Sequence, residues 1–161
     1  MTALRILTLM AATLTMGLTA GAFALYAHTI MPGLGRTDDR TFVGSFQAMD
    51  RAIMNPWFIG CCFFGALLLT ALAGVAALRT GAFVWIAVAF GLYLVAVVLT
   101  VAVNVPLNDA LKAAGDPGRI DVAAARAAFH ETRWVVSNVV RTILTTGAFG
   151  LLAWALVVTE R

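Results

Sequence analysis

A line of polar and aromatic side chains lies within an apolar stretch near the C-terminal end of the sequence. The residues are His130, Trp134, Asn138, Arg141 and Thr145, and at about 100° per residue they fall within an arc of roughly 80° on one helix face. His130 is a candidate general acid or base, and Arg141 could bind an anionic or enolate-like oxygen. An arginine held near the centre of a membrane helix costs about 2.5–3.5 kcal/mol, so Arg141 should face protein or water and have a partner.

Arg141 and Asn138 also have a purely structural interpretation. The guanidinium could join helices by bonding to the side chains of Asn104 and Asn108 and to carbonyls freed near Pro106. Asparagines that face each other inside a helical bundle frequently hold it together in the same way. Both interpretations stay open at this point.

His130, Trp134 and His28 have alternatives of their own. His130 could be a solvated residue beside the membrane, and Trp134 could either stack on a flat ligand or anchor the chain at the membrane interface. His28 could pair with Met31 as a soft metal site or share an ion with His130. No motif typical of zinc, nucleotide or dinucleotide sites occurs, so no cofactor is expected and a metal held by the two histidines is retained as the alternative.

The composition identifies the elements that must position these residues. The chain has 161 residues, of which 61% are hydrophobic and 12% charged, with a mean hydropathy of +0.93. About 20 apolar residues are needed to span a membrane as a helix, and four stretches qualify, namely residues 6–27, 57–78, 82–103 and 135–158. The sequence therefore predicts a single integral membrane domain over residues 1–161, an all-α antiparallel bundle of four transmembrane helices.

The connections predict two further helical features. Residues 37–53 form an amphipathic interfacial helix with Thr37 as its N-cap, which should lie over the mouth of the bundle as a lid. Asp121 caps a second helix, which could run unbroken into the fourth span and extend it to almost forty residues, about 55 Å. Pro32 and Pro106 are expected to end the first and third spans.

Both long connections, residues 28–56 and 104–134, must emerge at the same end of the bundle because two spans separate them. Polar residues of both connections should therefore converge at this end, above Arg141 and Asn138. A polar stripe on the third span, with Tyr93, Thr100 and Asn104 at offsets of seven and eleven residues, leads toward it. The converging residues are His28, Asn104, Asn108, Asp109, His130 and Trp134.

The distribution of charge bears on partners and orientation. The net charge is +3, but the basic residues are scattered singly, so nucleic acid is excluded as a partner. Lys and Arg residues are more numerous at the loop-bearing end, which favours placing that end in the cytoplasm. The expected partners are the lipid bilayer and a hydrophobic small molecule, with homo-oligomerisation left open, and the expected location is the inner (cell) membrane of a bacterium.

Several short pieces of the sequence resemble the anthrone oxygenase family of small four-helix membrane proteins. They are Met31-Pro32-Gly33-Leu34, Phe46-Gln47-Ala48-Met49, Asn55-Pro56, Asn104-Val105-Pro106-Leu107-Asn108, and the set Trp134, Asn138, Arg141 and Thr142. Fungal members of this family insert oxygen into anthrones, which are flat tricyclic polyketides, to give anthraquinones.

The resemblance implies a deprotonated anthrone that reacts directly with dioxygen, without metal or flavin. It implies His130 as the base, Arg141 with Asn104 and Asn138 around the enolate oxygen, and Trp134 over the ring face; Asn108, Tyr93 and His28 complete the candidate binding set. An oxygenase should have one enclosed cavity that touches both His130 and Arg141. The alternatives are a non-enzymatic protein that binds a lipid or partner, with a purely structural polar stripe, and a small transporter or metal-handling protein.

Overall fold

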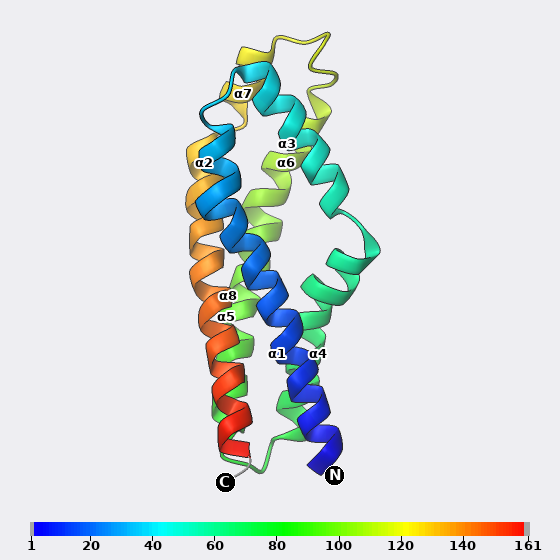
Figure 1. Cartoon of the computed structure of the whole chain (residues 1–161), viewed down its shortest axis with the longest axis vertical. Helices are drawn as coiled ribbons and strands as arrows, with labels where there is room; N and C mark the ends of the chain where they lie inside the picture. Colours follow the sequence, from blue (N-terminus) through cyan, green and yellow to red (C-terminus); the bar gives the residue numbers. More distant parts are fainter. Residues whose placement is uncertain (1, 160–161) are drawn as a thin grey trace.

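The computed structural model describes residues 2–159, which form helices joined by short turns and contain no strand over that range (Figure 1). Four segments are long and apolar enough to cross a membrane: Ala3–Leu34, Trp57–Ala76, Phe83–Ala113 and Glu131–Val158. Large apolar side chains such as Leu68 and Ile143 point outward, with 61% and 66% of their surface exposed, as expected in contact with lipid. The chain is an integral membrane protein, and the predicted all-α four-span bundle is confirmed.

The lower part of the bundle is a four-helix core. Helix α8 (Glu131–Thr159) packs against both α1 (Thr2–Leu25) and α5 (Phe83–Leu99), and α4 (Gly65–Ala76) contacts α1 and α5. Alanines line much of the shared interior, where small side chains let helix backbones approach closely. Gly17 serves the same purpose, because a Cβ there would lie 2.9 Å from the Phe149 ring.

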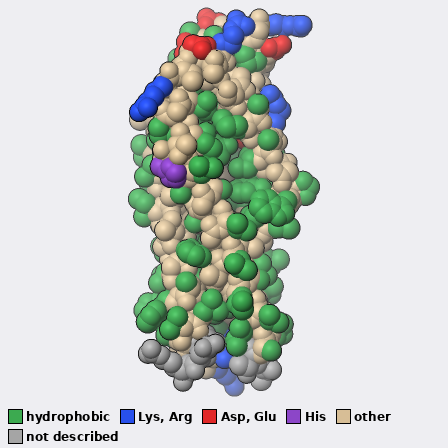
Figure 2. All heavy atoms as spheres, viewed as in Figure 1, with side chains coloured by type: hydrophobic (Ala, Val, Ile, Leu, Met, Phe, Trp, Pro, Cys, Tyr) green, Lys and Arg blue, Asp and Glu red, His purple; other side chains and the backbone are tan. Residues whose placement is uncertain are grey.

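The upper part of the bundle is closed by a different helix. Helix α3 (Asp39–Ile53) packs on α6 (Val105–Ala113) and α7 (Val122–Ala128), as the amphipathic pattern predicted. Phe42, Phe46, Phe129 and Trp134 form much of a second apolar cluster at this end. Charged side chains gather around it, whereas hydrophobic side chains cover most of the face below (Figure 2).

Two predicted helix boundaries are wrong. The N-cap of α3 is Asp38 rather than Thr37: Asp38 accepts hydrogen bonds from the amide and hydroxyl of Thr41 at 3.0 and 2.7 Å, and these bonds hold its pKa below the usual range. Asp121 does cap a helix, by accepting from the Ala124 amide. That helix ends at Ala128, and the chain turns at His130, whose φ is +52°, because Phe129 is buried in the second cluster.

The prolines shape the helices rather than ending them, which corrects a third prediction. The first span continues through Pro32 into α2 (Met31–Leu34), and the third continues through Pro106 into α6. The turn just before each proline widens into a π-helix, η1 (Tyr26–Ile30) and η3 (Thr100–Asn104), and a third one, η2 (Trp57–Phe64), directly follows Pro56. A proline cannot donate to the carbonyl four residues earlier, so a wider turn keeps the helix continuous.

Replacing Gly65 by alanine tests how far the fold depends on η2. A Cβ at Gly65 would lie 3.0 Å from the carbonyl oxygen of Gly60, so the π-helical turn must shift to accommodate it. We expect Gly65→Ala to lower the melting temperature in detergent, although alanine is otherwise about 0.5–1 kcal/mol better than glycine in a helix. Gly60→Ala is the matched control, since nothing lies within 4 Å of its added Cβ. Equal melting temperatures for the two variants would show that the turn tolerates the change.

Candidate functional site

The site is an aromatic cavity of about 180 Å³ at the junction of the upper and lower parts of the bundle. It lies where α3 ends and η2 begins, and α1, η1, η3, α6 and α8 complete its walls. All three π-helical segments contribute side chains to it, and such segments are frequent at functional sites. Seven aromatic side chains line the cavity: Phe23, Tyr26, Phe46, Phe58, Phe63, Phe64 and Trp134.

Arg141 is the buried cation of this cavity, with 4% of its surface exposed. Its Nη1 donates to Thr100 Oγ1 at 3.0 Å and its Nη2 to Asn138 Oδ1 at 2.8 Å. The guanidinium carbon lies 4.4 Å from the centre of the Phe23 ring. Among residues 2–159 no carboxylate forms an ion pair with Arg141, and its buried Nε has no hydrogen-bond partner. Arg141 therefore keeps an uncompensated positive charge and free donor capacity beside the cavity.

The asparagines do not hold Arg141 in the way the structural interpretation expected. Asn104 donates to the Trp134 carbonyl at 3.3 Å and accepts from the Ser137 hydroxyl at 2.7 Å. Asn138 donates to the carbonyl of Phe23 at 3.1 Å while it accepts from Arg141. These side chains line the cavity, but most of their hydrogen bonds join one helix to another. Of these asparagines, only Asn138 accepts a hydrogen bond from Arg141.

A second polar group in the cavity is Asp50, at the end of α3. Its carboxylate accepts from Asn108 Nδ2 at 2.6 Å and forms an ion pair with Lys112 at 2.7 Å. Asn108 in turn accepts from the indole nitrogen of Trp134 at 2.7 Å. Lys112 is partly exposed and also pairs with the exposed Asp109 at 3.0 Å. The buried carboxylate is thus connected to the aqueous end of the protein through Lys112.

Trp134 is a wall of the cavity rather than an interfacial anchor. Only 4% of its surface is exposed, and its ring packs edge-on against Phe46 with centroids 5.5 Å apart. Tyr26 lies on another side of it, at a centroid distance of 5.8 Å. The indole is therefore held in position by its hydrogen bond to Asn108 and by aromatic contacts, which suits it to stack against a flat ligand.

The cavity opens toward lipid. Four of its apolar lining residues, Met54, Phe64, Val101 and Val105, are also exposed on the outside of the bundle, by 59, 51, 57 and 37%. Met54 lies in the elbow between α3 and η2, Phe64 ends η2, and Val101 and Val105 belong to η3 and α6. Figure 1 shows this elbow standing away from the rest of the bundle. A ligand can therefore enter sideways from the bilayer.

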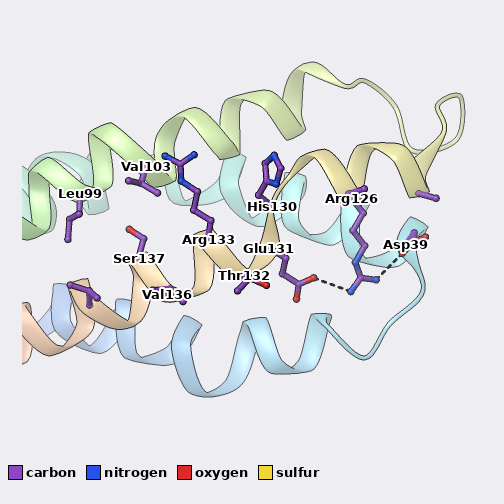
Figure 3. A pocket seen from close by; sticks show the side chains of 13 residues that line it. Asp39, Leu99, Val103, Arg126, His130, Glu131, Thr132, Arg133, Val136 and Ser137 are labelled. Atoms are coloured by element: carbon purple, nitrogen blue, oxygen red, sulfur yellow. Dashed lines mark hydrogen bonds and ion pairs between the residues drawn. The ribbon is translucent and has the colours of Figure 1, made fainter.

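The structure brings five of the eight predicted site residues to this cavity: Arg141, Asn138, Asn104, Asn108 and Trp134. The other three lie elsewhere. His130 is exposed and lines a separate open groove (Figure 3), so no single described cavity touches both His130 and Arg141. The Tyr93 hydroxyl donates to the Phe63 carbonyl at 2.8 Å, and Tyr93 packs behind the cavity wall. His28 is exposed on η1 and its Nδ1 lies 2.6 Å from the Thr29 hydroxyl.

Sequence reasoning missed Asp50 and Tyr26 as site residues. Asp50 lies within the predicted amphipathic helix but was not singled out there, and only 6% of its surface is exposed. The signal that could have found it is its position one residue after Met49, close to the apolar stripe of that helix and seven residues before Trp57. Across residues 2–159 no group of three or more His, Cys, Asp or Glu side chains lies together as a metal site would require.

The comparison with known proteins identifies a family for the chain. The sequence profile of the anthrone oxygenase family matches residues 54–151, more than half of the chain. The matched region includes η2, η3 and the cavity face of α8. No curated protein and no solved structure shows a significant match to the chain.

Replacing Asp50 by alanine tests the polar network of the upper bundle. The change leaves the buried amide of Asn108 without its acceptor and removes one carboxylate from Lys112, for a cost of about 1–3 kcal/mol. We expect the melting temperature in detergent to fall by roughly 4–8 °C. The control is Asp109→Ala, which removes the other, 62% exposed, carboxylate from the same lysine and should cost under about 1 kcal/mol. Similar shifts for both variants would mean that Asp50 does not anchor the network.

Proposed function

Because the chain belongs to the anthrone oxygenase family, we propose that it is a membrane-embedded oxygenase that acts on a flat lipophilic phenol or anthrone-like substrate. The observation that carries this proposal is the guanidinium of Arg141, which is buried, faces an aromatic cavity and pairs with no described carboxylate. A phenolate or enolate oxygen supplies the negative charge that such a group would bind.

The cavity supports a ring-shaped substrate. Its volume of about 180 Å³ exceeds the roughly 150 Å³ of an engineered apolar cavity that binds benzene. Trp134 and Phe46 offer flat faces and edges for ring stacking. Since the cavity opens between η2 and η3 to the bilayer, a larger ring system can extend into the opening while its oxygen reaches Arg141.

The proposed reaction needs a base, an oxyanion site and dioxygen. Removal of a proton from the CH₂ group of an anthrone gives an enolate, whose oxygen the free donors of Arg141 would stabilise. The electron-rich carbon transfers an electron to dioxygen and forms a C–O bond, giving a peroxide anion that takes up one proton to become a hydroperoxide. Loss of water then takes the second hydrogen and leaves a carbonyl. The net change is CH₂ + O₂ → C=O + H₂O, so no external reductant is consumed.

Asp50 is the base that the geometry favours over His130. Asp50 lines the same cavity as Arg141, whereas His130 lines the separate groove. The ion pair with Lys112 connects the carboxylate to the partly exposed end of α6, where a proton could leave to water. Asp50 would therefore take the proton inside the cavity and release it outside.

We also infer that the protein resides in the cell membrane of a bacterium with its loop-bearing end in the cytoplasm. The support is the excess of Lys and Arg in the two long connections over the short connection between α4 and α5. The substrate would then reach the cavity from the bilayer rather than from the aqueous phase.

Arg141→Gln is the direct test of the oxyanion site. With anthrone as substrate, purified wild-type protein should form anthraquinone and incorporate one ¹⁸O atom from ¹⁸O₂, measured by mass spectrometry. Loss of a preorganised charged donor should lower the turnover rate by about 10²-fold or more, because the enolate charge is no longer stabilised. Arg119→Gln removes an exposed arginine that lies outside both the cavity and the groove and serves as the control. A rate in Arg141→Gln that equals wild type, with melting temperature unchanged, would leave Arg141 without a catalytic role.

The identity of the base is tested by comparing Asp50→Asn with His130→Gln. The amide in Asp50→Asn keeps the shape of the side chain but cannot accept the substrate proton, so we expect the rate of enolate formation to fall by on the order of 10²-fold. Exchange of the anthrone CH₂ hydrogens with D₂O under anaerobic conditions, followed by NMR, measures this step without dioxygen. If exchange survives in Asp50→Asn and disappears in His130→Gln, the base is His130 instead.

A further inference from the structure

The outer face of α8 carries an open groove of about 990 Å³ that the proposed oxygenase reaction does not use (Figure 3). Its walls come from α8, from α7, and from Leu99 and Val103 of the third span. The groove shares no lining residue with the aromatic cavity. The groove is therefore a separate candidate for binding a ligand.

The groove is amphiphilic along its length. One end is lined by Leu99, Val103, Val136 and Val140, all apolar side chains of transmembrane segments. The other end is lined by polar and charged residues of α7 and the start of α8, including Arg126, His130, Glu131 and Arg133. A molecule that fills it must combine an apolar chain with a polar head.

The charged side chains at the polar end of the groove form two groups, on opposite sides of α8. Arg126 binds Asp39 at 3.0 Å and Glu131 at 3.3 Å, so these two carboxylates already have a cation. His130 and Arg133 extend toward α6 instead, on the opposite side of α8 from this cluster (Figure 3). Arg133 forms no ion pair with any residue of the described chain and is exposed. The side that faces α6 therefore offers a free guanidinium next to an imidazole.

Arg133 also lies at the depth of the lipid headgroups. The apolar stretch of α8 begins two residues later, at Val135. At the other end of the helix, Trp154 is 45% exposed and packs against Trp85, as expected of an interfacial pair. Arg133 and Trp154 are 21 residues apart in the sequence, about 32 Å along the helix, which matches the roughly 30 Å thickness of a hydrocarbon core.

We propose that this groove binds an anionic phospholipid, with the phosphate at Arg133 and His130 and one acyl chain along Leu99, Val103, Val136 and Val140. The unpaired guanidinium of Arg133 complements the negative charge of the phosphate. The side chains of Leu99, Val103, Val136 and Val140 form an apolar track for the acyl chain. A zwitterionic lipid presents the same acyl chain but adds a cationic headgroup beside Arg133, so the groove should select against it.

Native mass spectrometry of the full chain, released from detergent with equimolar dioleoylphosphatidylglycerol and dioleoylphosphatidylcholine, tests the proposal. We expect wild-type protein to retain phosphatidylglycerol in preference to phosphatidylcholine. Arg133→Gln should reduce this preference roughly fivefold, the effect of removing one basic contact to an anionic headgroup. Val140→Trp, which fills the apolar track without changing charge, should reduce retention of both lipids.

The matched control is Arg119→Gln. It removes an exposed arginine from the same end of the protein but outside the groove, so the lipid preference should stay at the wild-type value. Equal retention of the two lipids by wild-type protein would overturn the proposal. A loss of preference in Arg119→Gln as large as in Arg133→Gln would also overturn it, because the selectivity would then come from overall charge. Neither result bears on anthrone oxidation, which depends on the aromatic cavity.

Discussion

A cation buried in a membrane bundle must be held by dipoles and ring faces when no carboxylate reaches it. Arg141 donates to the oxygens of Thr100 and Asn138 and lies over the face of the Phe23 ring, and a desolvated cation–π contact of this kind is worth about 2 kcal/mol. Each holder is fixed in turn: Thr100 donates to the Ala96 carbonyl, and Asn138 donates to the carbonyl of Phe23. The cation thus ties α8 to η3 and α1, and the cavity exists between these three segments and η2.

The cavity follows from how the chain accommodates its prolines. Pro32 and Pro106 each remove one helical hydrogen bond near the same depth of the bundle, and the π-helical turns before them rotate Tyr26 and Asn104 relative to a regular helix. Pro56 starts η2 and separates it from α3, so the second span diverges from α6 at this level. Side chains from all three widened segments line the cavity, whereas alanines line much of the lower core. The cavity is therefore associated with the distorted parts of the spans.

The four spans, the amphipathic helix and the convergence of Asn104, Asn108 and Trp134 could be predicted because hydropathy, period and connectivity are properties of single segments. The continuation of helices through Pro32 and Pro106 could not, because it depends on widened turns that tertiary packing stabilises. His130 was misplaced for a related reason: its helical register pointed to the polar face, but burial of Phe129 ends α7 and turns the chain before α8 begins. Asp50 was missed because its partners Asn108 and Lys112 lie about sixty residues away in the sequence.

The two buried charges of the cavity, those of Asp50 and Arg141, are held apart, and this separation suits the proposed reaction. Asp50 and Arg141 line one cavity, yet they form no ion pair, since each is engaged by its own partners. A direct pair would satisfy both groups and leave only a structural contact between helices. Held apart, a carboxylate and a guanidinium can act on two ends of one molecule. An anthrone presents its acidic CH₂ and its carbonyl oxygen at opposite edges of the central ring, so proton removal at one end develops negative charge at the other. A cavity that holds a base and a cation without letting them neutralise each other is what that redistribution of charge requires.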